Sequence, residues 1–445
     1  MTEVSGNRLS EGSPVCWPSD WRTAPLWSMF ERVKDVEHPH EELLSVYREH
    51  GVVKREGRDD NYNKAALDRS IYQLVHPGWL VVNRMKAWQG SVGISPYRGI
   101  VSGHYICFRP KHNEDHRFLN WLFRSAVYAA EYASLSRGVR PNQVEIDNEW
   151  LRALQVKLPP LEEQRRIADF LDAEIARIDK LDGLRKVQEL NLAERRYASV
   201  SEILLPGILT DPSGLWPWTW LPRATNNRPF VRLGYVCRLQ NGLTVDGKRE
   251  IFGDAVTRPY LRVANVQAGS VALETVTEIT VPRTVADRST LRPGDVLMTE
   301  GGDLDKLGRG TVWRGELPNC LHQNHVFALR PEQDRLDGDY LALMTRTLHG
   351  RCYFESTGTK TTNLASTNSS KILSFPIPLP NVATQRELAQ QAQKALEAAE
   401  AASRLLNHQR SLLTERRQAL ITAAVTGQFD VSTASGRNVT DGAQA

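Results

Sequence analysis

The chain has 445 residues, of which 41% are hydrophobic and 24% charged, which suits roughly two to four globular domains and excludes an intrinsically disordered protein. Its formal net charge is only +4, so a nucleic-acid surface has to come from local clusters of arginine and lysine. The five cysteines are scattered and include no Cys-x-x-Cys pair, which argues against a disulfide framework and a zinc ribbon.

Residues 1–20 contain no basic stretch followed by an apolar one, and nowhere do about eighteen apolar residues run together. We therefore expect a flexible N-terminus over 1–20 in a cytoplasmic protein. Residues 21–157 alternate short apolar runs with Gly, Pro, Asn and Asp, as in Gly-Trp-Leu-Val-Val-Asn at 78–83, which predicts a β-rich domain. One helix is expected within it, over residues 118–132.

A helix-favouring stretch over 158–210 predicts the first of two long helices. Its apolar residues recur at steps of three and four, as in a coiled coil. These residues are Ile167, Leu171, Ile175, Ile178, Leu181, Leu184 and Val187. A helix from Glu162 to about Leu205 would run for about 66 Å. An isolated helix of this length leaves its apolar seam in water, so it needs a partner.

The second half of the chain repeats this order. Residues 211–378 predict a second β-rich domain, with one helix over 339–353, and residues 379–427 predict a second long helix before a flexible tail at 428–445. The apolar seam of the second helix consists of Leu388, Ala392, Leu396, Ala399, Ala402, Leu405 and Leu412. Equal spacing allows the two seams to pair along their length.

An internal duplication underlies this order. A shift of 221 positions superposes the two helix regions without a net insertion. Matched pairs include Leu158 with Leu379, Pro159 with Pro380, Gln164 with Gln385, Arg165 with Arg386, the triplet 194–196 with 415–417, and Arg109 with Arg330, while Pro77-Gly78 matches Pro293-Gly294 at an offset of 216. We predict an α+β fold: two β-rich domains separated by two long antiparallel coiled-coil helices, with an internal pseudo-twofold repeat. The alternative is that each helix packs only on its own domain.

The segment at 158–168, Leu-Pro-Pro-Leu-Glu-Glu-Gln-Arg-Arg-Ile-Ala, resembles the motif that opens a conserved helix in the DNA specificity subunits of type I restriction-modification systems. Residues 83–88, 99–102 and 260–266 are also similar to that family, so the resemblance covers nearly the whole chain. It implies two target-recognition domains, at 21–157 and 211–378, alternating with two conserved helices. The second helix start, at 379–385, departs from the pattern because it lacks the second proline and the acidic pair.

The resemblance also implies a division of labour. The chain would not be an enzyme; it would bind double-stranded DNA, recognise an asymmetric bipartite target and dock two methyltransferase subunits, and through them endonuclease subunits. AdoMet, ATP and Mg would belong to those partners, which methylate adenine and cleave DNA, and no cofactor is expected in this chain. The positions expected at the partner surface are Gln164, Arg165, Gln385 and Arg386.

Base readout requires donors and acceptors presented from loops. In the first domain the candidates are Arg84, Lys86, Ser102, His104, Arg137 and Arg140. In the second domain they are Arg262, Asn265, Lys306, Arg309, Gln323, Asn324 and Lys360. For any single residue, a solvated surface or a local cap is the competing interpretation.

Two further patterns are set aside. Residues 242–248 fit the first seven positions of a phosphate-binding loop, but Arg249 stands where a hydroxyl would hold magnesium. Cys320, His322 and His325 lack a fourth ligand, so no metal site is expected. The alternative to DNA reading is a non-catalytic protein-interaction scaffold of two modules on a coiled-coil rod. Duplex binding that falls steeply with salt separates the two functions.

Overall fold

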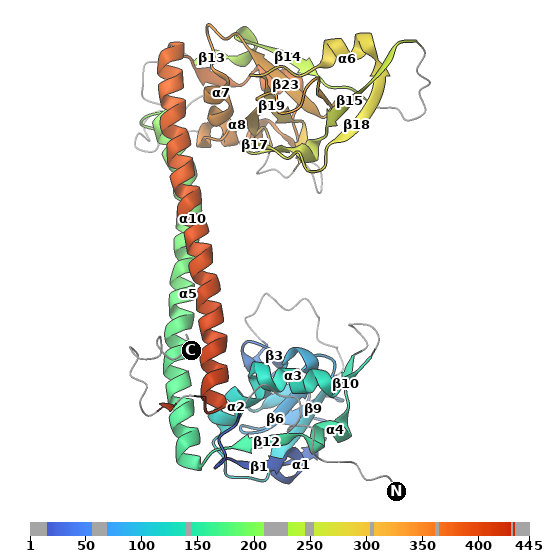
Figure 1. Ribbon diagram of the computed structural model, residues 1–445, viewed down its shortest axis with the longest axis vertical. Coiled ribbons are helices and arrows are strands. Elements are labelled where there is room, and N and C mark those ends of the chain that lie inside the picture. The colour runs from blue at the N-terminus through green and yellow to red at the C-terminus, as the bar shows by residue number, and fades with distance from the viewer. Residues whose placement is uncertain are drawn as a thin grey trace. The chain divides into compact units, whose positions relative to one another are not determined.

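The computed structural model describes residues 16–55, 69–138, 144–208, 230–244, 253–302, 307–360, 365–428 and 430–431. The chain divides into two compact units. Unit 1 contains residues 1–185 and 408–445, and unit 2 contains residues 186–407. Each unit therefore combines one β-rich domain with segments of two long helices, α5 (Leu161–Leu204) and α10 (Val382–Val425), which are both 44 residues long (Figure 1).

The β-rich domain of unit 1 is built on a four-stranded antiparallel sheet in the order β2–β9–β6–β7. Two helices, α2 and α3, follow β9 in the chain. The elements are β1 (Arg22–Pro25), α1 (Leu26–Met29), β2 (Phe30–Val33), β3 (Leu44–Tyr47), β4 (Gly51–Lys54), β5 (Gln73–Val75), β6 (Leu80–Asn83), η1 (Ala87–Gln89), β7 (Val92–Ile94), β8 (Gly99–Val101), β9 (Tyr105–Pro110), α2 (His116–Arg124), α3 (Ala126–Ser134), β10 (Ser136–Arg137), β11 (Glu145–Ile146), α4 (Asn148–Ala153) and β12 (Gln155–Leu158).

The β-rich domain of unit 2 has a sheet of the same kind, in the order β14–β23–β19–β21, and two helices, α7 and α8, again follow the sheet. The elements are β13 (Phe230–Arg232), η3 (Leu233–Tyr235), β14 (Cys237–Asn241), β15 (Ala255–Leu261), η4 (Val263–Asn265), β16 (Val266–Gln267), β17 (Ser270–Val271), β18 (Thr277–Pro282), α6 (Arg283–Ser289), β19 (Val296–Thr299), β20 (Gly301–Gly302), β21 (Gly310–Val312), β22 (Leu321–His322), β23 (Val326–Pro331), α7 (Gly338–Met344), α8 (Leu348–Thr357), β24 (Thr359–Lys360), β25 (Ala365–Ser366), α9 (Ser369–Leu373) and β26 (Pro376–Pro378).

The duplication extends from the helices into both β-rich domains. β1 pairs antiparallel with β12 in unit 1, just as β13 pairs with β26 in unit 2. Gly78 and Gly294, which the sequence comparison matched, both take the left-handed conformation, with φ of 86° and 94°. This conformation favours glycine because it has no Cβ. The two domains therefore share one frame.

The additions to this frame differ. Among the described residues, unit 1 adds three two-stranded sheets, β3–β4, β5–β8 and β10–β11. Unit 2 adds the three-stranded sheets β18–β15–β22 and β20–β25–β24 and the hairpin β16–β17. The loops that these strands present are consequently different in the two units.

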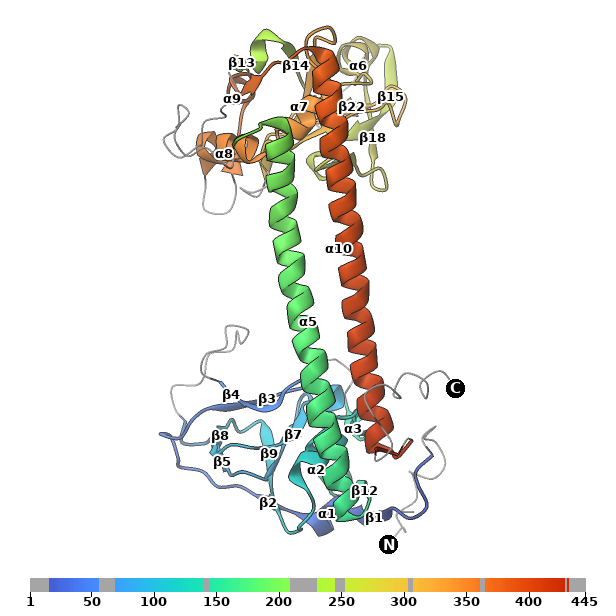
Figure 2. The ribbon, with the colours of Figure 1, turned by 90° about the vertical axis from the view of Figure 1, so that its left-hand side faces the viewer.

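Within each unit, the segments of α5 and α10 run side by side in opposite directions (Figure 2). In unit 1, Asp179 pairs with Arg417 at 3.2 Å and Asp182 pairs with Arg410 at 2.8 Å, so residue numbers rise along one helix as they fall along the other. The predicted antiparallel pairing is confirmed. The helices also pack on the domains, because helix and domain side chains belong to one hydrophobic cluster in each unit.

The apolar seam is buried over only part of its predicted length. Ile167, Leu171, Ile175 and Ile178 are buried, and full burial of side chains of this size contributes roughly 1.5–3 kcal/mol each. Leu181, Leu184 and Val187 are exposed instead, as are Leu190, Leu405 and Leu412. The prediction of a continuous buried seam is therefore wrong in the middle of the helices. None of the helices among the described residues is long and apolar enough to cross a membrane.

The single helix predicted in each domain is in fact two. In unit 1 the helix breaks at Ser125, whose side chain caps α3 by accepting a hydrogen bond from the Tyr128 amide. In unit 2 Thr347 caps α8 in the same way through the Gly350 amide. Both capping residues are buried. A hydroxyl that satisfies a free amide at a helix start favours a break there, even though the flanking apolar pattern runs on.

A buried histidine makes the stability of unit 2 dependent on pH. His349 lies against Phe375 with ring centroids 5.3 Å apart, and its Nε2 donates to the Pro376 carbonyl oxygen at 2.7 Å. Burial lowers the pKa of His349 to about 4. The folded chain thus keeps this ring neutral while the unfolded chain takes up a proton near pH 6.5. The stabilisation is fully present above that pH and is lost as the pH falls towards 4.

We expect the free energy of unfolding of the variant His349→Phe to depend less on pH than that of the parent. In the parent, this residue is expected to lower the free energy of unfolding by about 2 kcal/mol between pH 7 and pH 5. Burial also lowers the pKa of His112 in unit 1 to about 4. His112 remains in the variant and accounts for the pH dependence that is left. Urea unfolding at several pH values measures this. If the free energy of unfolding changed with pH as steeply in the variant as in the parent, His349 would not be the proton-linked group.

Candidate nucleic-acid interface

Helix α5 begins with a buried glutamine that is bonded to the β-rich domain of unit 1. The Gln164 Oε1 accepts a hydrogen bond from the Asp115 amide at 3.0 Å. Its Nε2 donates to the Pro159 carbonyl oxygen at 2.9 Å and to a Glu114 carboxylate oxygen at 2.5 Å. Asp115 is itself the N-cap of α2. The start of the long helix is therefore tied to the first helix of its domain.

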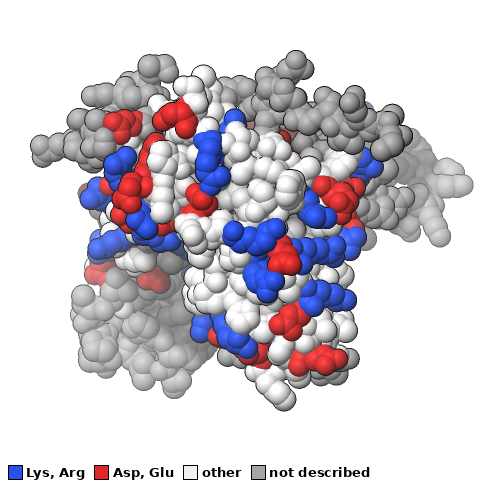
Figure 3. Space-filling model, turned by 90° about the horizontal axis from the view of Figure 1, so that it is seen from below, with Lys and Arg blue, Asp and Glu red and all other residues white. Residues whose placement is uncertain are grey.

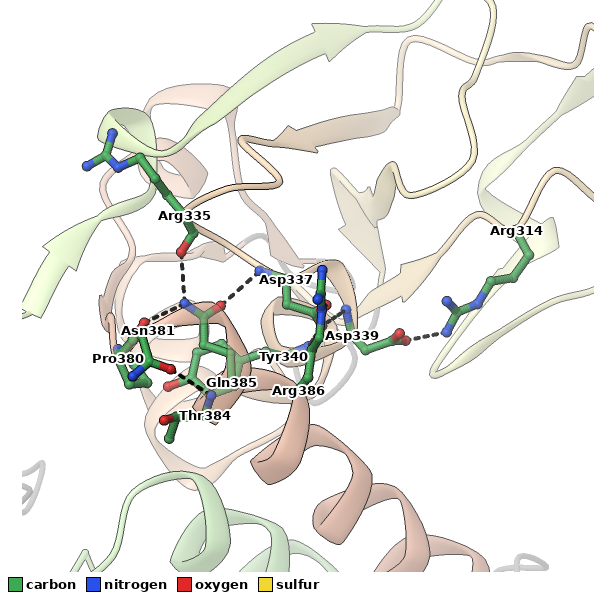
Figure 4. A network of polar contacts seen from close by, with 10 residues as sticks. All are labelled: Arg314, Arg335, Asp337, Asp339, Tyr340, Pro380, Asn381, Thr384, Gln385 and Arg386. Carbon is green, nitrogen blue, oxygen red and sulfur yellow. Dashed lines mark hydrogen bonds and ion pairs between the residues drawn. The ribbon is translucent and has the colours of Figure 1, made fainter.

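The start of α10 repeats this network in unit 2 (Figure 4). The Gln385 Oε1 accepts from the Asp337 amide at 2.8 Å, and its Nε2 donates to the carbonyl oxygens of Arg335 at 2.8 Å and Pro380 at 2.7 Å. Asp337 caps α7 and also pairs with Arg386 at 3.3 Å. The same residue types at the same repeat positions thus hold each β-rich domain on its helix.

This geometry corrects the prediction that Gln164 and Gln385 contact a partner. Both side chains are 0% exposed, and their amide oxygen and nitrogen atoms are bonded to their own unit. The neighbouring Arg165 and Arg386 are 52% and 62% exposed, so these two remain candidates for a partner surface. The repeat revealed that the glutamines matter, but it did not reveal which way they point.

Four of the candidate DNA-reading residues of unit 1 lie where β6 ends and β9 begins. Asn83, the last residue of β6, faces Tyr105, the first of β9. The Arg84 amide donates to the His104 carbonyl oxygen at 3.0 Å, and the Lys86 amide donates to the Asn83 side chain at 3.2 Å. Arg84, Lys86 and His104 are exposed, and Ser102 is half-buried.

The hairpin β10–β11 adds Arg137 to this group. The Ile146 amide donates to the Arg84 carbonyl oxygen at 3.1 Å, so the hairpin lies directly against the turn after β6. Arg84 pairs with Glu145 at 3.0 Å, and the guanidinium of Arg137, which faces Glu145 across the hairpin, lies 4.1 Å from the centre of the Trp150 ring. The structure therefore brings five of the six candidates of the first domain to one edge of unit 1.

In unit 2 three candidates meet where two parallel strands end. Because β15 and β22 are parallel, the residues that follow them lie at the same edge of their sheet. The Gln323 amide donates to the Leu261 carbonyl oxygen at 2.8 Å, and the Asn324 amide donates to the Leu243 carbonyl oxygen at 3.0 Å. Arg262 follows β15 and is exposed, whereas Gln323 and Asn324 are half-buried.

Asn265 does not belong to this edge, and its prediction as a DNA contact is wrong. Its side chain is fully buried; Oδ1 accepts from the Arg262 amide at 2.8 Å, and Nδ2 donates to the Ala272 carbonyl oxygen at 2.9 Å. Asn265 thereby closes the turn that presents Arg262. Sequence alone does not separate an asparagine that reads a base from one that closes a turn, because both lie in polar loops.

Comparison with known proteins decides the family. Residues 18–191 match the family model described as type I restriction modification DNA specificity domain. The chain is 21% identical over 439 residues to the type I restriction enzyme EcoKI specificity subunit of Escherichia coli (strain K12), with 96% of this chain and 91% of that protein covered. It is 20% identical over 436 residues to the StySPI specificity subunit of Salmonella potsdam, covering 93% and 90%. Together these matches support a type I DNA specificity subunit, with similarity over nearly the whole chain.

Solved structures agree with this fold. One, which concerns complex assembly and conformational transition of the type I R-M system, gives a TM-score of 0.69 at 18% identity and covers 94% of this chain and 100% of that one. The HsdS subunit from Thermoanaerobacter tengcongensis gives 0.53 at 18% identity, covering 94% and 99%. As a specificity subunit, the chain is a non-catalytic DNA-recognition subunit of a restriction-modification complex.

The remaining candidates of this specificity subunit are dispersed. Arg309 lines a cavity of unit 2 with Arg196, Arg346 and Arg351, three arginines that sequence reasoning missed. Arg196 had one available signal, because it belongs to the repeated triplet at 194–196. Arg140 and Lys306 lie outside the described residues, and for Lys360 only the backbone, in β24, is described.

The two patterns set aside in the specificity subunit have structural roles. A Cβ on Gly242 would lie 2.0 Å from the Gln323 carbonyl oxygen. Glycine is therefore required there by the close approach of two backbone segments rather than by a phosphate. The His322 Nδ1 donates to the Val326 carbonyl oxygen at 2.7 Å, and His325 pairs with Glu300. Among the described residues, no group of three or more His, Cys, Asp or Glu side chains is placed to hold a metal.

The net charge of the specificity subunit does not by itself locate a DNA-binding face. On the face shown in Figure 3, lysine and arginine side chains are interleaved with aspartate and glutamate. This agrees with the small net charge of +4. The candidate interface therefore rests on the geometry of the strand ends and loops.

Proposed function

We propose that this specificity subunit reads an asymmetric, bipartite DNA target, with each recognition domain reading one half-site. The observation that carries the proposal is one repeated frame with unlike additions: β3–β4 and β5–β8 in unit 1, and β18–β15–β22 with β16–β17 in unit 2. A repeated frame suits two half-sites, and different loops favour different bases. The domain limits proposed are 21–157 and 211–378, with helices at 158–210 and 379–427 and loose ends at 1–20 and 428–445.

The proposed readers are the clustered residues at the strand ends. In unit 1 these are Arg84, Lys86, Ser102, His104 and Arg137, and in unit 2 Arg262, Gln323 and Asn324. Arg140, Lys306, Arg309 and Lys360 remain proposed DNA contacts. Arginine, glutamine and asparagine suit base edges because each offers two hydrogen-bonding groups in a plane, whereas Lys86 is suited to a phosphate.

We also propose that two methyltransferase subunits dock on the helices, one on each unit, with endonuclease subunits attached through them. Exposed apolar side chains support this. Unit 1 exposes Leu181 and Leu184 on α5 and Leu412 on α10, and unit 2 exposes Val187 and Leu190 on α5 and Leu405 on α10. Exposed apolar patches mark interaction surfaces. AdoMet, ATP and Mg would then be bound by those partners, in the cytoplasm.

Mapping methylated adenines across the genome of cells with and without this gene tests the proposed function. A single bipartite, asymmetric motif should lose its methylation when the gene is deleted and regain it when the gene is restored. A contiguous or palindromic motif would contradict the assignment of unlike half-sites. An unchanged methylation pattern, with the partner methyltransferase present, would contradict DNA reading itself.

Single substitutions should act on one half-site each. The variants His104→Ala in unit 1 and Gln323→Ala in unit 2 are expected to weaken binding to the target duplex by roughly 5- to 100-fold and to leave non-target binding unchanged. The control is Arg177→Ala, an exposed arginine of α5 that pairs with Glu174 of the same helix. Binding curves on targets altered in one half-site check this. Equal losses on target and non-target DNA would exclude base reading by these residues.

A further inference from the structure

A cavity of about 270 Å³ in unit 2 is lined mainly by arginines. They come from three separate parts of the chain: Arg196 from α5, Arg309 from the residues before β21, and Arg346 and Arg351 from the turn between α7 and α8 and from α8 itself. The other lining residues are Tyr197, Gln267, Ala268 and Glu400. Four guanidinium groups and a single carboxylate thus surround this space.

The positive charges affect the groups around the cavity. The pKa of Arg346 is lowered, first by burial and then by the positive charge of Arg196. Burial by itself raises the pKa of the Tyr197 hydroxyl, but the hydrogen bond from Arg196, at 3.2 Å, and the charges of Arg309 and Arg351 outweigh it and lower that pKa. The guanidinium carbons of Arg196 and Arg351 each lie 5.0 Å from the centre of the Tyr197 ring. Such crowding of like charges favours a ligand with negative charge.

Two of these arginines also have an unused donor. The Nε atoms of Arg196 and Arg351 are buried and have no hydrogen-bond partner among the described residues. Glu355 binds Arg351 through a different nitrogen, Nη2, at 3.2 Å. A buried donor without an acceptor is destabilising, so both Nε atoms favour a ligand that brings acceptor oxygens into the cavity.

The equivalent place in unit 1 has fewer arginines, although the Nε atom of Arg124 there is also buried without a hydrogen-bond partner among the described residues. Counting from the two capping residues, Ser125 and Thr347, Arg124 corresponds to Arg346 and an alanine, Ala129, to Arg351. Arg124 donates to the carbonyl oxygens of Arg48 and Glu49, and Arg417, the repeat equivalent of Arg196, pairs with Asp179 at 3.2 Å. The excess of positive charge is therefore a feature of unit 2 and not a requirement of the shared frame.

We propose that this cavity binds a phosphate group, and that the phosphate belongs to the DNA backbone beside the half-site that unit 2 reads. Guanidinium groups bind phosphate oxygens through pairs of parallel hydrogen bonds. DNA is favoured as the source because Gln267 and Ala268, on the cavity wall, follow closely on Arg262 and the turn that Asn265 closes. This inference rests on the proposed function.

The test uses the full-length chain and the variants Arg351→Ala and Arg196→Gln. Arg351→Ala installs the residue that unit 1 has at the equivalent place, so it is expected to fold; thermal melting checks both variants. Arg404→Ala, an exposed arginine elsewhere on α10, is the control. Each cavity variant should weaken binding to target and non-target duplex alike, by roughly 3- to 10-fold, and should reduce the slope of log affinity against log salt by about one.

The outcomes separate the possible phosphate sources. If the duplex affinity of both variants is unchanged, but inorganic phosphate raises the melting temperature of the parent and not of the variants, the site binds free phosphate and the assignment to DNA is overturned. If neither duplex affinity nor phosphate stabilisation differs from the control, the whole inference is overturned. A parent chain that does not distinguish target from non-target duplex would instead contradict the proposed function.

Discussion

Replacing Arg330 by leucine is expected to lower the free energy of unfolding of unit 2 by about 3–5 kcal/mol. Arg330 binds Asp295 through two parallel contacts, Nε to Oδ1 at 2.8 Å and Nη2 to Oδ2 at 2.7 Å, and the Asp295 side chain is 0% exposed. Asp295 also accepts from the Arg292 amide at 2.8 Å and so shapes the turn before β19. Without Arg330 the Asp295 carboxylate would lose both of these contacts and stay buried.

The repeat supplies the control for this substitution. Arg109 is the equivalent of Arg330 in unit 1, but it pairs with Glu31 on the surface, where the two side chains are 55% and 48% exposed. Water screens such a pair, so Arg109→Leu should change stability much less. Urea unfolding of the full chain, with hydrogen exchange reporting on each unit, compares the two. Equal effects of both substitutions would show that burial of Asp295 does not determine the loss.

The helices and the repeat were predictable because their signals are local. The two helix regions have the same length, so a constant offset of 221 residues matches them and pairs Gln164 with Gln385. Their apolar residues recur at steps of three and four, which predicted the antiparallel pair of helices. The strand pairing of the domains was not predictable in the same way. β2 pairs with β9 and β14 with β23, with residues 44–101 and 255–322 in between, and the insertions between them differ in the two units.

The candidate site was predictable in part. Arg84 and His104 are polar residues in loops and Arg137 ends β10, and the strands bring these three residues to one edge. Asn265 has the same sequence signal, yet it is buried, and its Oδ1 and Nδ2 atoms are both hydrogen-bonded within the turn. The arginine cavity escaped prediction because its residues come from distant segments. Arg196 and Arg346 are 150 positions apart in the chain, and no local pattern connects them.

The substitutions Gln164→Ala and Gln385→Ala are each expected to lower the free energy of unfolding by about 2–4 kcal/mol, because each leaves one backbone amide donor and two acceptors without their buried partner. In unit 2 these are the Asp337 amide and the carbonyl oxygens of Arg335 and Pro380. Since the two networks are alike, the two losses should be similar. Gln390→Ala, at an exposed position of α10, should have little effect.

Measurements on the isolated chain distinguish the structural role from a role in partner binding. If the glutamines held partner subunits, each variant would unfold at the same urea concentration as the parent, and only assembly with the methyltransferase would fail. If they hold the domains on the helices, stability falls before any partner is added. Assembly of the glutamine variants is then weakened only in proportion to their loss of stability. Arg165→Ala and Arg386→Ala, at exposed neighbouring positions, are the variants expected to lose partner binding without losing stability.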